Sequence, residues 1–108
     1  MAEKTSKVKQ IIQSYAKELG SLGIQVEKVI LYGSFTKGTS GGDSDIDLLV
    51  ISRDFERMNL RERLETLGVA AAHIRQPIQA LGYTPGELKN IKKASFLEEI
   101  LGSKTVHF

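Results

Sequence analysis

The apolar residues near the start of the chain recur three and four positions apart, a spacing that places them on one face of a helix. Lysine and glutamine fill most of the other positions between Lys4 and Leu19, and Gly20 follows, as glycine often does where a helix ends. The pattern predicts an amphipathic first helix over 4–19. Its apolar face carries Val8, Ile11, Ile12, Tyr15, Ala16 and Leu19.

Three shorter apolar runs have the composition of β-strands. Residues 26–32 and 45–52 contain nearly continuous stretches of Val, Ile and Leu, as expected of strands that are covered on both faces. Residues 78–83, directly after Pro77, predict a third strand. A stretch rich in glycine and hydroxyl residues, 33–42, separates the first two strands and predicts a loop.

Residues 54–75 return to helical spacing and predict a second helix. Gly68 lies inside this segment, and because glycine costs roughly 1 kcal/mol against alanine in a helix interior, we expect a kink there. Pro77 blocks continuation of the helix. The apolar residues that carry the pattern are Leu60, Leu64, Leu67, Ala71 and Ile74.

A third helix has a start signal of its own. Thr84 is placed to be the N-cap, Pro85 occupies the first helical position, and Glu87 can complete a capping box. We expect this helix to reach about Leu101. The tail 105–108 is expected to return as a short edge strand.

These elements predict an α/β fold, more narrowly α+β, in which helices cover a small mixed β-sheet. With 108 residues, of which 41% are hydrophobic and 26% charged, the chain 1–108 is expected to form a single globular domain. The absence of cysteine excludes disulfides, thiolate zinc sites and cysteine nucleophiles.

Charge and hydropathy restrict the surroundings of the chain. A formal net charge of +2 is too small to argue for a duplex nucleic acid as an obligate partner. No apolar run has the form of a signal peptide, and none approaches the roughly 20 residues of a membrane span. We therefore expect a cytoplasmic protein with no membrane partner. An open sheet edge and apolar helix residues make a homodimer plausible.

The loop after the first strand concentrates the candidate chemistry. Gly33 allows a sharp turn and a close approach of the backbone to a ligand, while the hydroxyl of Ser34 and nearby amides can donate hydrogen bonds to phosphate oxygens. A short helix that begins after Ser34 would add its positive N-terminal end. The loop therefore predicts phosphate binding.

Two carboxylates follow at the start of the second strand. Asp45 and Asp47 are two residues apart, so both point to one face of the sheet and Ile46 points into the core on the other. Carboxylates held roughly 6–7 Å apart on one face repel, and a divalent cation between them compensates. Hard oxygen ligands fit Mg²⁺ or Mn²⁺, ions that neutralise charge during phosphoryl or nucleotidyl transfer.

The same residues have plainer interpretations. An isolated Asp-x-Asp is short and common and can be a solvated strand entrance, but its combination with Gly33 and Ser34 favours a site. Residues 33–40 also partly match a phosphate-binding P-loop, although Thr39 stands where the lysine of that motif must be.

Other polar residues are weaker candidates. His73 lies in an alanine-rich helix and His107 in the tail, and both are expected to be structural or solvated. Arg53 follows the second strand closely enough to reach a substrate. One group of lysines is either an exposed helix face or a contact to nucleotide or partner: Lys89, Lys92 and Lys93.

The constellation resembles the minimal nucleotidyltransferase domains of the DNA polymerase beta nucleotidyltransferase superfamily. Their signature is an apolar strand, Gly-Ser, a spacer and Asp-x-Asp within an apolar run. It is matched here by 29–34, the ten residues 35–44 and then 45–50, with Lys37 and Gly38 where the family carries a basic residue and a second glycine. The likeness extends to the family's closing segment through Tyr83, Thr84, Pro85, Glu87, Phe96, Leu97, Glu99, Ile100 and Leu101.

That resemblance implies catalytic, metal-binding roles for Asp45 and Asp47. An acceptor hydroxyl would attack the α-phosphate of ATP or another nucleoside triphosphate and take up the nucleoside monophosphate, AMP above all, while pyrophosphate leaves. Small members of the family pair with a helical protein of the HEPN class in toxin–antitoxin modules, some by transferring AMP to a tyrosine, and the motif spacing here is similar to those antitoxins. The implied nucleotide-binding residues are Gly33, Ser34, Lys37, Gly38 and Ser44.

One position departs from the pattern. Active relatives carry a third carboxylate on the strand beside Asp-x-Asp, and that position aligns with Gln79, which cannot act as a base. No acidic residue occurs between Glu65 and Glu87 to replace it. We therefore predict nucleotide and metal binding and leave two functions open: a transferase, or a catalytically impaired, antitoxin-like module that neutralises a HEPN-type partner by binding.

Overall fold

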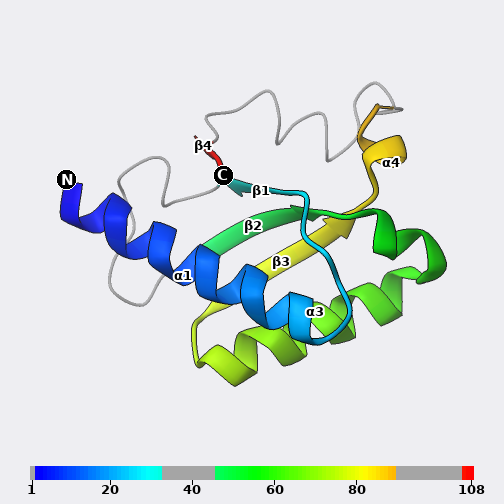
Figure 1. Ribbon diagram of the computed structural model, residues 1–108, viewed down its shortest axis with the longest axis horizontal. Coiled ribbons are helices and arrows are strands. Elements are labelled where there is room, and N and C mark those ends of the chain that lie inside the picture. The colour runs from blue at the N-terminus through cyan, green and yellow to red at the C-terminus, as the bar shows by residue number, and fades with distance from the viewer. Residues whose placement is uncertain (1, 33–45, 90–105) are drawn as a thin grey trace.

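The computed structural model describes residues 2–32, 46–89 and 106–108 (Figure 1). It confirms the predicted fold class, a small mixed sheet with helices. The elements are α1 (Ala2–Ser21), β1 (Lys28–Tyr32), β2 (Ile46–Ile51), the 3-10 helix η1 (Arg53–Arg57), α3 (Leu60–Ile74), β3 (Ile78–Tyr83), α4 (Pro85–Lys89) and β4 (Val106–His107).

The sheet has the strand order β3-β2-β1-β4. β1 is antiparallel to both β2 and β4, whereas β2 and β3 are parallel and are joined by a crossover through η1 and α3. The tail forms the expected edge strand, in which Val106 faces Leu31 across the ladder and His107 faces Ile30. The two central strands, β1 and β2, therefore have neighbours on both sides.

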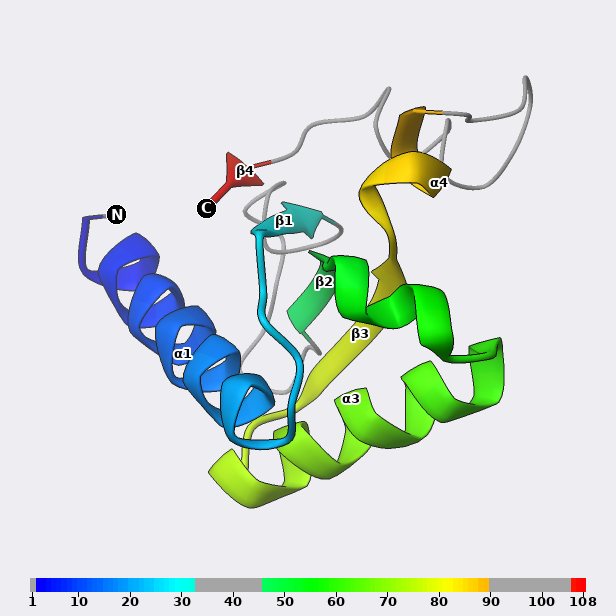
Figure 2. The ribbon, with the colours of Figure 1, turned by 45° about the vertical axis from the view of Figure 1, so that its right-hand side comes forward.

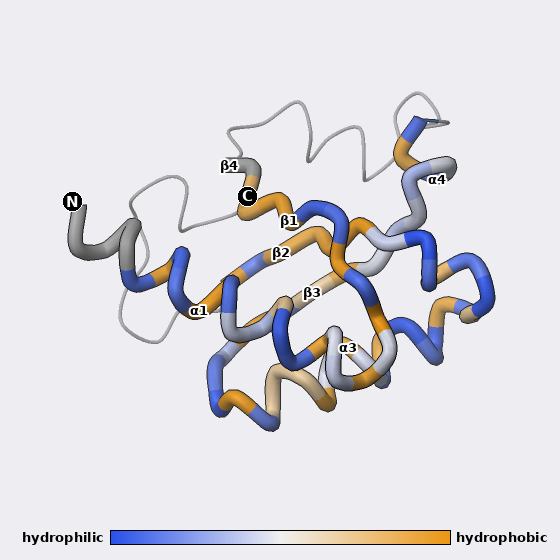
Figure 3. Tube along the Cα trace, in the orientation of Figure 1, coloured by the Kyte–Doolittle hydropathy of each residue, from blue (hydrophilic) through white to orange (hydrophobic). Residues whose placement is uncertain are grey.

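The main core lies between one face of the sheet and the helices α1 and α3, which both cover that face (Figures 1 and 2). β1 and β2 are mostly hydrophobic in Figure 3, as expected for buried strands, whereas the edge strand β3 is paler. The hydroxyl of Tyr15 in α1 donates a hydrogen bond of 2.7 Å to the carbonyl oxygen of Leu67 in α3. Burial raises the pKa of Tyr15, so its phenol stays neutral and fixes one helix to the other.

The opposite face of the sheet carries a second, smaller cluster. Its fully buried members are Ile30 and Leu49, and the partly buried residues packed on them are Tyr32, Leu81, Tyr83 and Leu88. Leu88 belongs to α4, so α4 contributes to this face and not to the main core.

The prediction of one continuous helix over 54–75 is wrong, because the structure has two separate helices there. The chain forms η1, breaks at Met58, and begins α3 with Asn59 as N-cap. The Asn59 side chain accepts from the Glu62 N–H, and the Glu62 carboxylate accepts from the Asn59 N–H, both at 2.8 Å. This capping box starts a new helix, whereas α3 runs unbroken through Gly68, where we expected a kink.

Arg63 joins η1, α3, β3 and α4. Its guanidinium donates to the carbonyl oxygens of Phe55 (2.8 Å), Met58 (3.1 Å) and Gly82 (3.2 Å). It also donates to both carboxylate oxygens of Glu87, at 2.8 and 3.3 Å, and lies 5.7 Å from the centre of the Phe55 ring. The start of α4 is therefore held against the end of β3.

The predicted capping box of the last helix is confirmed. The Thr84 N–H donates to the Glu87 carboxylate at 2.8 Å, and the Glu87 N–H donates to the Thr84 hydroxyl at 3.1 Å. The hydrogen bonds from Arg63 and Thr84 lower the pKa of Glu87. The continuation of this helix toward Leu101 lies outside the described residues. In the described parts of the chain, no helix combines the length and apolarity needed to cross a membrane.

Candidate functional site

The candidate site lies where β1 ends and β2 begins. The chain leaves β1 at Tyr32 and enters β2 at Ile46, and Tyr32 faces Asp47 across the antiparallel ladder. Both ends of the predicted phosphate-binding loop are thus fixed at one end of the sheet, beside an aspartate. Most of the predicted site residues lie outside the described ranges: Gly33, Ser34, Lys37, Gly38, Ser44 and Asp45.

Asp47 projects from the face of the sheet opposite α1 and α3. Its neighbour Ile46 is 2% exposed in the main core, and Leu48 is also buried there, so alternation places Asp47 on the other face. The prediction that Ile46 enters the core is confirmed. Asp47 is half-buried, which leaves part of its carboxylate accessible.

Gln79 is the register partner of Asp47 on the parallel side. Tyr32, Asp47 and Gln79 therefore form one row across three neighbouring strands, each roughly 4.8 Å from the next. The family resemblance predicts that Gln79 stands at the position of a third carboxylate, and the register places its strand position directly beside Asp47.

Tyr32 is a member of this row that the sequence reasoning did not single out. Burial and then the negative charge of Asp47 raise the pKa of its phenol, with a smaller contribution from Tyr83. Tyr32 is therefore a neutral hydroxyl beside a carboxylate. Its place one residue before Gly33, in step with the buried Ile30, is the signal that could have identified it.

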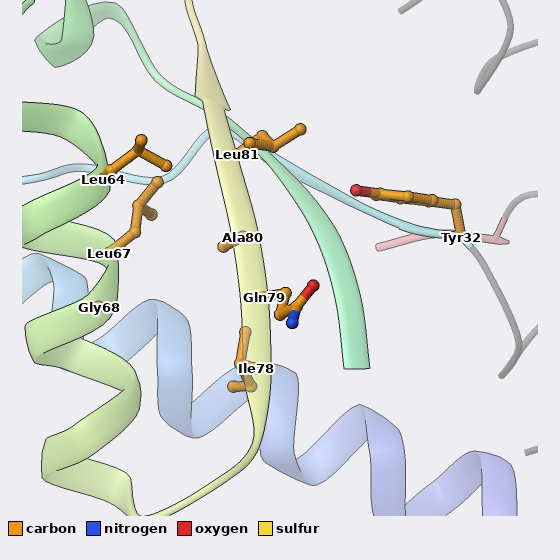
Figure 4. Close-up of a pocket in the computed structure, with 8 residues that line it drawn as sticks. All are labelled: Tyr32, Leu64, Leu67, Gly68, Ile78, Gln79, Ala80 and Leu81. Atoms are coloured by element: carbon orange, nitrogen blue, oxygen red, sulfur yellow. The ribbon is translucent and has the colours of Figure 1, made fainter. Parts of the chain in front are cut away.

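A hollow of about 440 Å³ opens at this row (Figure 4). In Figure 4 the phenol of Tyr32 and the amide of Gln79 point toward one another from the two strands that flank β2. The hollow continues around β3 to α3. Its lining residues are Tyr32, Leu64, Leu67, Gly68, Ile78, Gln79, Ala80 and Leu81.

The donor chemistry of the row fits a hard divalent cation. Asp47 offers carboxylate oxygens and Gln79 an amide oxygen, and Mg²⁺ is commonly held by one or two carboxylates together with substrate phosphates. Among the residues that the structure describes, no three His, Cys, Asp or Glu side chains form a group that could hold a metal by themselves. A cation at Asp47 would thus need ligands beyond the described residues, such as Asp45 or a nucleotide.

The weaker candidates lie elsewhere. Arg53 follows β2 at the end of the sheet remote from Asp47, where its Nε lies 3.6 Å from the carboxylate of Glu27. His73 is structural, since its Nδ1 lies 2.6 Å from the carboxylate of Glu18 and joins α3 to α1. Lys89 is exposed at the end of α4, and His107 pairs with β1 through β4.

Comparison with known sequences gives two matches. The family model described as "Nucleotidyltransferase domain" matches residues 8–105. A relative from Methanocaldococcus jannaschii, named "Putative protein adenylyltransferase", is 27% identical over 96 residues, which cover 84% of this chain and 89% of that protein.

Solved structures share the fold, among them two crystal structures. The crystal structure of "a putative nucleotidyltransferase from Sulfolobus solfataricus" has a TM-score of 0.65 at 21% identity and covers 99% of this chain and 84% of that one. The crystal structure of "the toxin-antitoxin with AMP-PNP" has a TM-score of 0.60 at 19% identity and covers 88% of this chain and 69% of that one. Because the family model matches almost the whole length of this chain, the chain belongs to the nucleotidyltransferase domain family.

Proposed function

We propose that this chain, acting as a single domain, is a Mg²⁺-dependent nucleotidyltransferase that transfers AMP from ATP to an acceptor hydroxyl on a partner protein. The observation that carries the proposal is the place of Asp47 at the end of the sheet where the glycine- and serine-rich loop is attached. The M. jannaschii relative is named as a protein adenylyltransferase, which supports ATP as donor and a protein as acceptor.

The chain would divide the work between its loop and its second strand. Gly33 and Ser34 would hold the triphosphate through backbone N–H groups and a hydroxyl, with Lys37 adding positive charge. Asp45 and Asp47 would hold the metal ion, which neutralises charge on the phosphates when bound. The remaining nucleotide contacts fall to Gly38 and Ser44.

In the transfer step, the acceptor oxygen forms a bond to the α-phosphorus while the bond from that phosphorus to the bridging oxygen of the β-phosphate breaks. Pyrophosphate leaves, and the hydroxyl proton passes to water. Gln79 holds the acceptor or Asp47 by hydrogen bonds but accepts no proton, because an amide is not a base at neutral pH. Tyr32, as a neutral phenol, can donate a hydrogen bond to a group bound at the same row.

A second function is favoured by Gln79. An amide beside Asp47, where active relatives carry an acid, suits a module that binds nucleotide weakly or without turnover. Such a module would neutralise a HEPN-type partner by contact, as an antitoxin. The toxin–antitoxin structure among the fold relatives is consistent with either version, since its likeness concerns the fold.

The deciding experiment measures ATP binding and turnover with and without Mg²⁺. Amide shifts would be followed on titration with ATP, and release of pyrophosphate would be assayed. For a transferase we expect metal-dependent shifts next to Tyr32 and Asp47, turnover in the wild-type chain, and loss of both in Asp47→Asn. Metal-independent turnover that survives in Asp47→Asn would refute the assignment.

Gln79→Glu separates the two functions, with Gln10→Glu on the exposed face of α1 as the matched control. If the chain is an impaired enzyme, turnover appears only in Gln79→Glu, because the substitution supplies a base in the row that contains Asp47. Turnover in the unmodified chain would show that the reaction does not need a carboxylate at position 79. Equal gains in both variants would mean that added negative charge, and not its position, is responsible.

A further inference from the structure

The outer edge of β3 carries backbone groups that point away from the sheet. β3 is the end strand, and the Ile46 N–H donates to the Pro77 carbonyl at 2.8 Å, while the Ser52 N–H donates to the Tyr83 carbonyl at 3.0 Å. Because N–H and C=O directions alternate along a strand, the odd-numbered residues of β3 face β2. The even-numbered residues, with Ala80 in the middle, face outward.

At both ends of this edge, outward-facing backbone groups already have hydrogen-bond partners. The Ile78 N–H donates to the Gln76 carbonyl at 2.9 Å, and the Gly82 carbonyl accepts from Arg63 at 3.2 Å. Between them, the Ile78 carbonyl and both backbone groups of Ala80 have no partner among the described residues. An unpaired edge of this kind is a template for another strand.

The hollow extends around this same edge. Gln79 and Leu81 line it on the face that carries Asp47, whereas Ile78 and Ala80 line it on the face that carries α3. Side chains of an added strand would alternate between these two faces. Successive side chains of the added strand would therefore enter the two halves of the hollow in turn.

Gly68 keeps the α3 half of the hollow open. It lies inside a helix without a positive φ, and a Cβ added there would meet nothing within 4 Å, so neither conformation nor packing requires glycine. Helix propensity disfavours it against alanine by roughly 1 kcal/mol. One turn earlier, Leu64 is 44% exposed and forms an apolar wall of the hollow.

A positive charge lies at the Ile78 end of this edge. The chain carries no carboxylate between Glu65 and Glu87, and Arg75 is exposed three residues before Ile78 with no ion-pair partner in the described ranges. An occupant with an acidic residue beside its apolar side chains would complement this edge.

We propose that the outer edge of β3 binds an extended polypeptide segment of a partner protein as an added strand, with an apolar side chain over Gly68 and an acidic residue near Arg75. The proposal that a strand docks here is supported by the unpaired edge of β3 and by the hollow around it. Only the further step, that this segment brings the acceptor hydroxyl toward Asp47, rests on the proposed function. Two strand spacings, about 10 Å in all, separate the added strand from β2.

The probe is a peptide selected from a random phage-displayed library on the full chain, then synthesised with a fluorophore and titrated without ATP or Mg²⁺. Gly68→Leu fills the α3 half of the hollow and improves helix propensity, so it should fold at least as well as the wild type. Gly20→Leu, an exposed α1 glycine that also has free space, is the matched control. Ala80→Pro removes the outward N–H from an edge where proline is tolerated.

We expect Gly68→Leu and Ala80→Pro to weaken peptide binding at least about tenfold and Gly20→Leu to leave it unchanged. If Ala80→Pro does not fold, Gly68→Leu alone decides. No enriched peptide, or one that binds all variants equally, would overturn the proposal. So would a concentration-dependent dimer in ultracentrifugation that Gly68→Leu abolishes, since the occupant would then be a second copy.

The failure of the docking proposal can be told apart from failure of the proposed function. Asp47→Asn should lose metal-dependent ATP binding and keep the peptide, whereas Gly68→Leu should lose the peptide and keep ATP binding. Peptide binding in a chain that shows no transfer would leave the docking site standing and refute the transferase.

Discussion

Replacing Arg63 with methionine tests whether one buried cation holds four elements together. Methionine keeps much of the apolar length of the side chain and removes every hydrogen bond of the guanidinium. The Arg63 side chain is 11% exposed, so water cannot readily take over its partners. The carbonyl oxygens of Phe55 and Gly82, both buried residues, would lose the bonds at 2.8 and 3.2 Å.

The size of the effect follows from those partners. The Gly82 carbonyl, left without a donor, costs about 1–1.5 kcal/mol. The Phe55 carbonyl keeps the Met58 N–H at 3.1 Å, so loss of its charged donor costs about 1 kcal/mol. The ion pair with Glu87 adds about 0.5 kcal/mol, because the Glu87 side chain is 45% exposed and solvent screens it. Arg63→Met should therefore lower the free energy of unfolding by about 3 kcal/mol, a large share of the 5–15 kcal/mol typical of a domain.

Urea unfolding of the two proteins measures this difference, with Arg61→Met as control. Arg61 lies on the same helix, its side chain is 86% exposed, and its pair with Glu65 at 2.9 Å should be worth no more than about 0.5 kcal/mol. A loss below about 1 kcal/mol in Arg63→Met, or equal losses in the two variants, would refute the reasoning that buried carbonyls dominate.

Three further substitutions test other contacts. Glu87→Gln should match the wild type at low pH and be less stable above the ordinary glutamate pKa of about 4.3, because a lowered pKa stabilises the fold only when the carboxylate is ionised. Urea unfolding midpoints of the two proteins, measured between pH 2 and 7, test this. A difference between the midpoints that stays constant with pH would contradict it. Gly82→Ala should cost about 1–3 kcal/mol, since its Cβ would lie 2.8 Å from the Phe55 ring, and an unchanged melting temperature would show that the ring moves freely. Tyr15→Phe should lose about 1 kcal/mol in urea unfolding, because it removes the phenol's hydrogen bond to the Leu67 carbonyl, which keeps its donor within α3. A neutral result would mean that water replaces the phenol.

The order of elements could be predicted because each depends on neighbouring residues. The alternation that sends Ile46 into the core and Asp47 to the other face follows from strand geometry alone. The Thr84–Glu87 capping box was equally readable, since both partners lie within one turn. The replacement of a third carboxylate by Gln79 stays a prediction, and the register shows only that Gln79 lies opposite Asp47.

The misses have two physical causes. The break at Asn59 was hidden because apolar spacing continues across it, although the same kind of capping signal as at Thr84 was present in the sequence. The contacts of Arg63 reach residues 8, 19 and 24 positions away, and no local pattern specifies such partners. The phosphate-binding half of the candidate site stays a prediction, since its residues lie outside the described ranges.

The pairing of β4 with β1 sets the timing of folding during synthesis. β1 is complete once Tyr32 has been made, but the strand that covers its outer edge contains Val106 and His107, near the other end of the chain. At 5–20 residues per second, a ribosome needs on the order of several seconds to make the chain between them. A nascent chain therefore passes through a stage in which a three-stranded sheet is open at both edges, and strand-to-strand association with other chains is most favourable then.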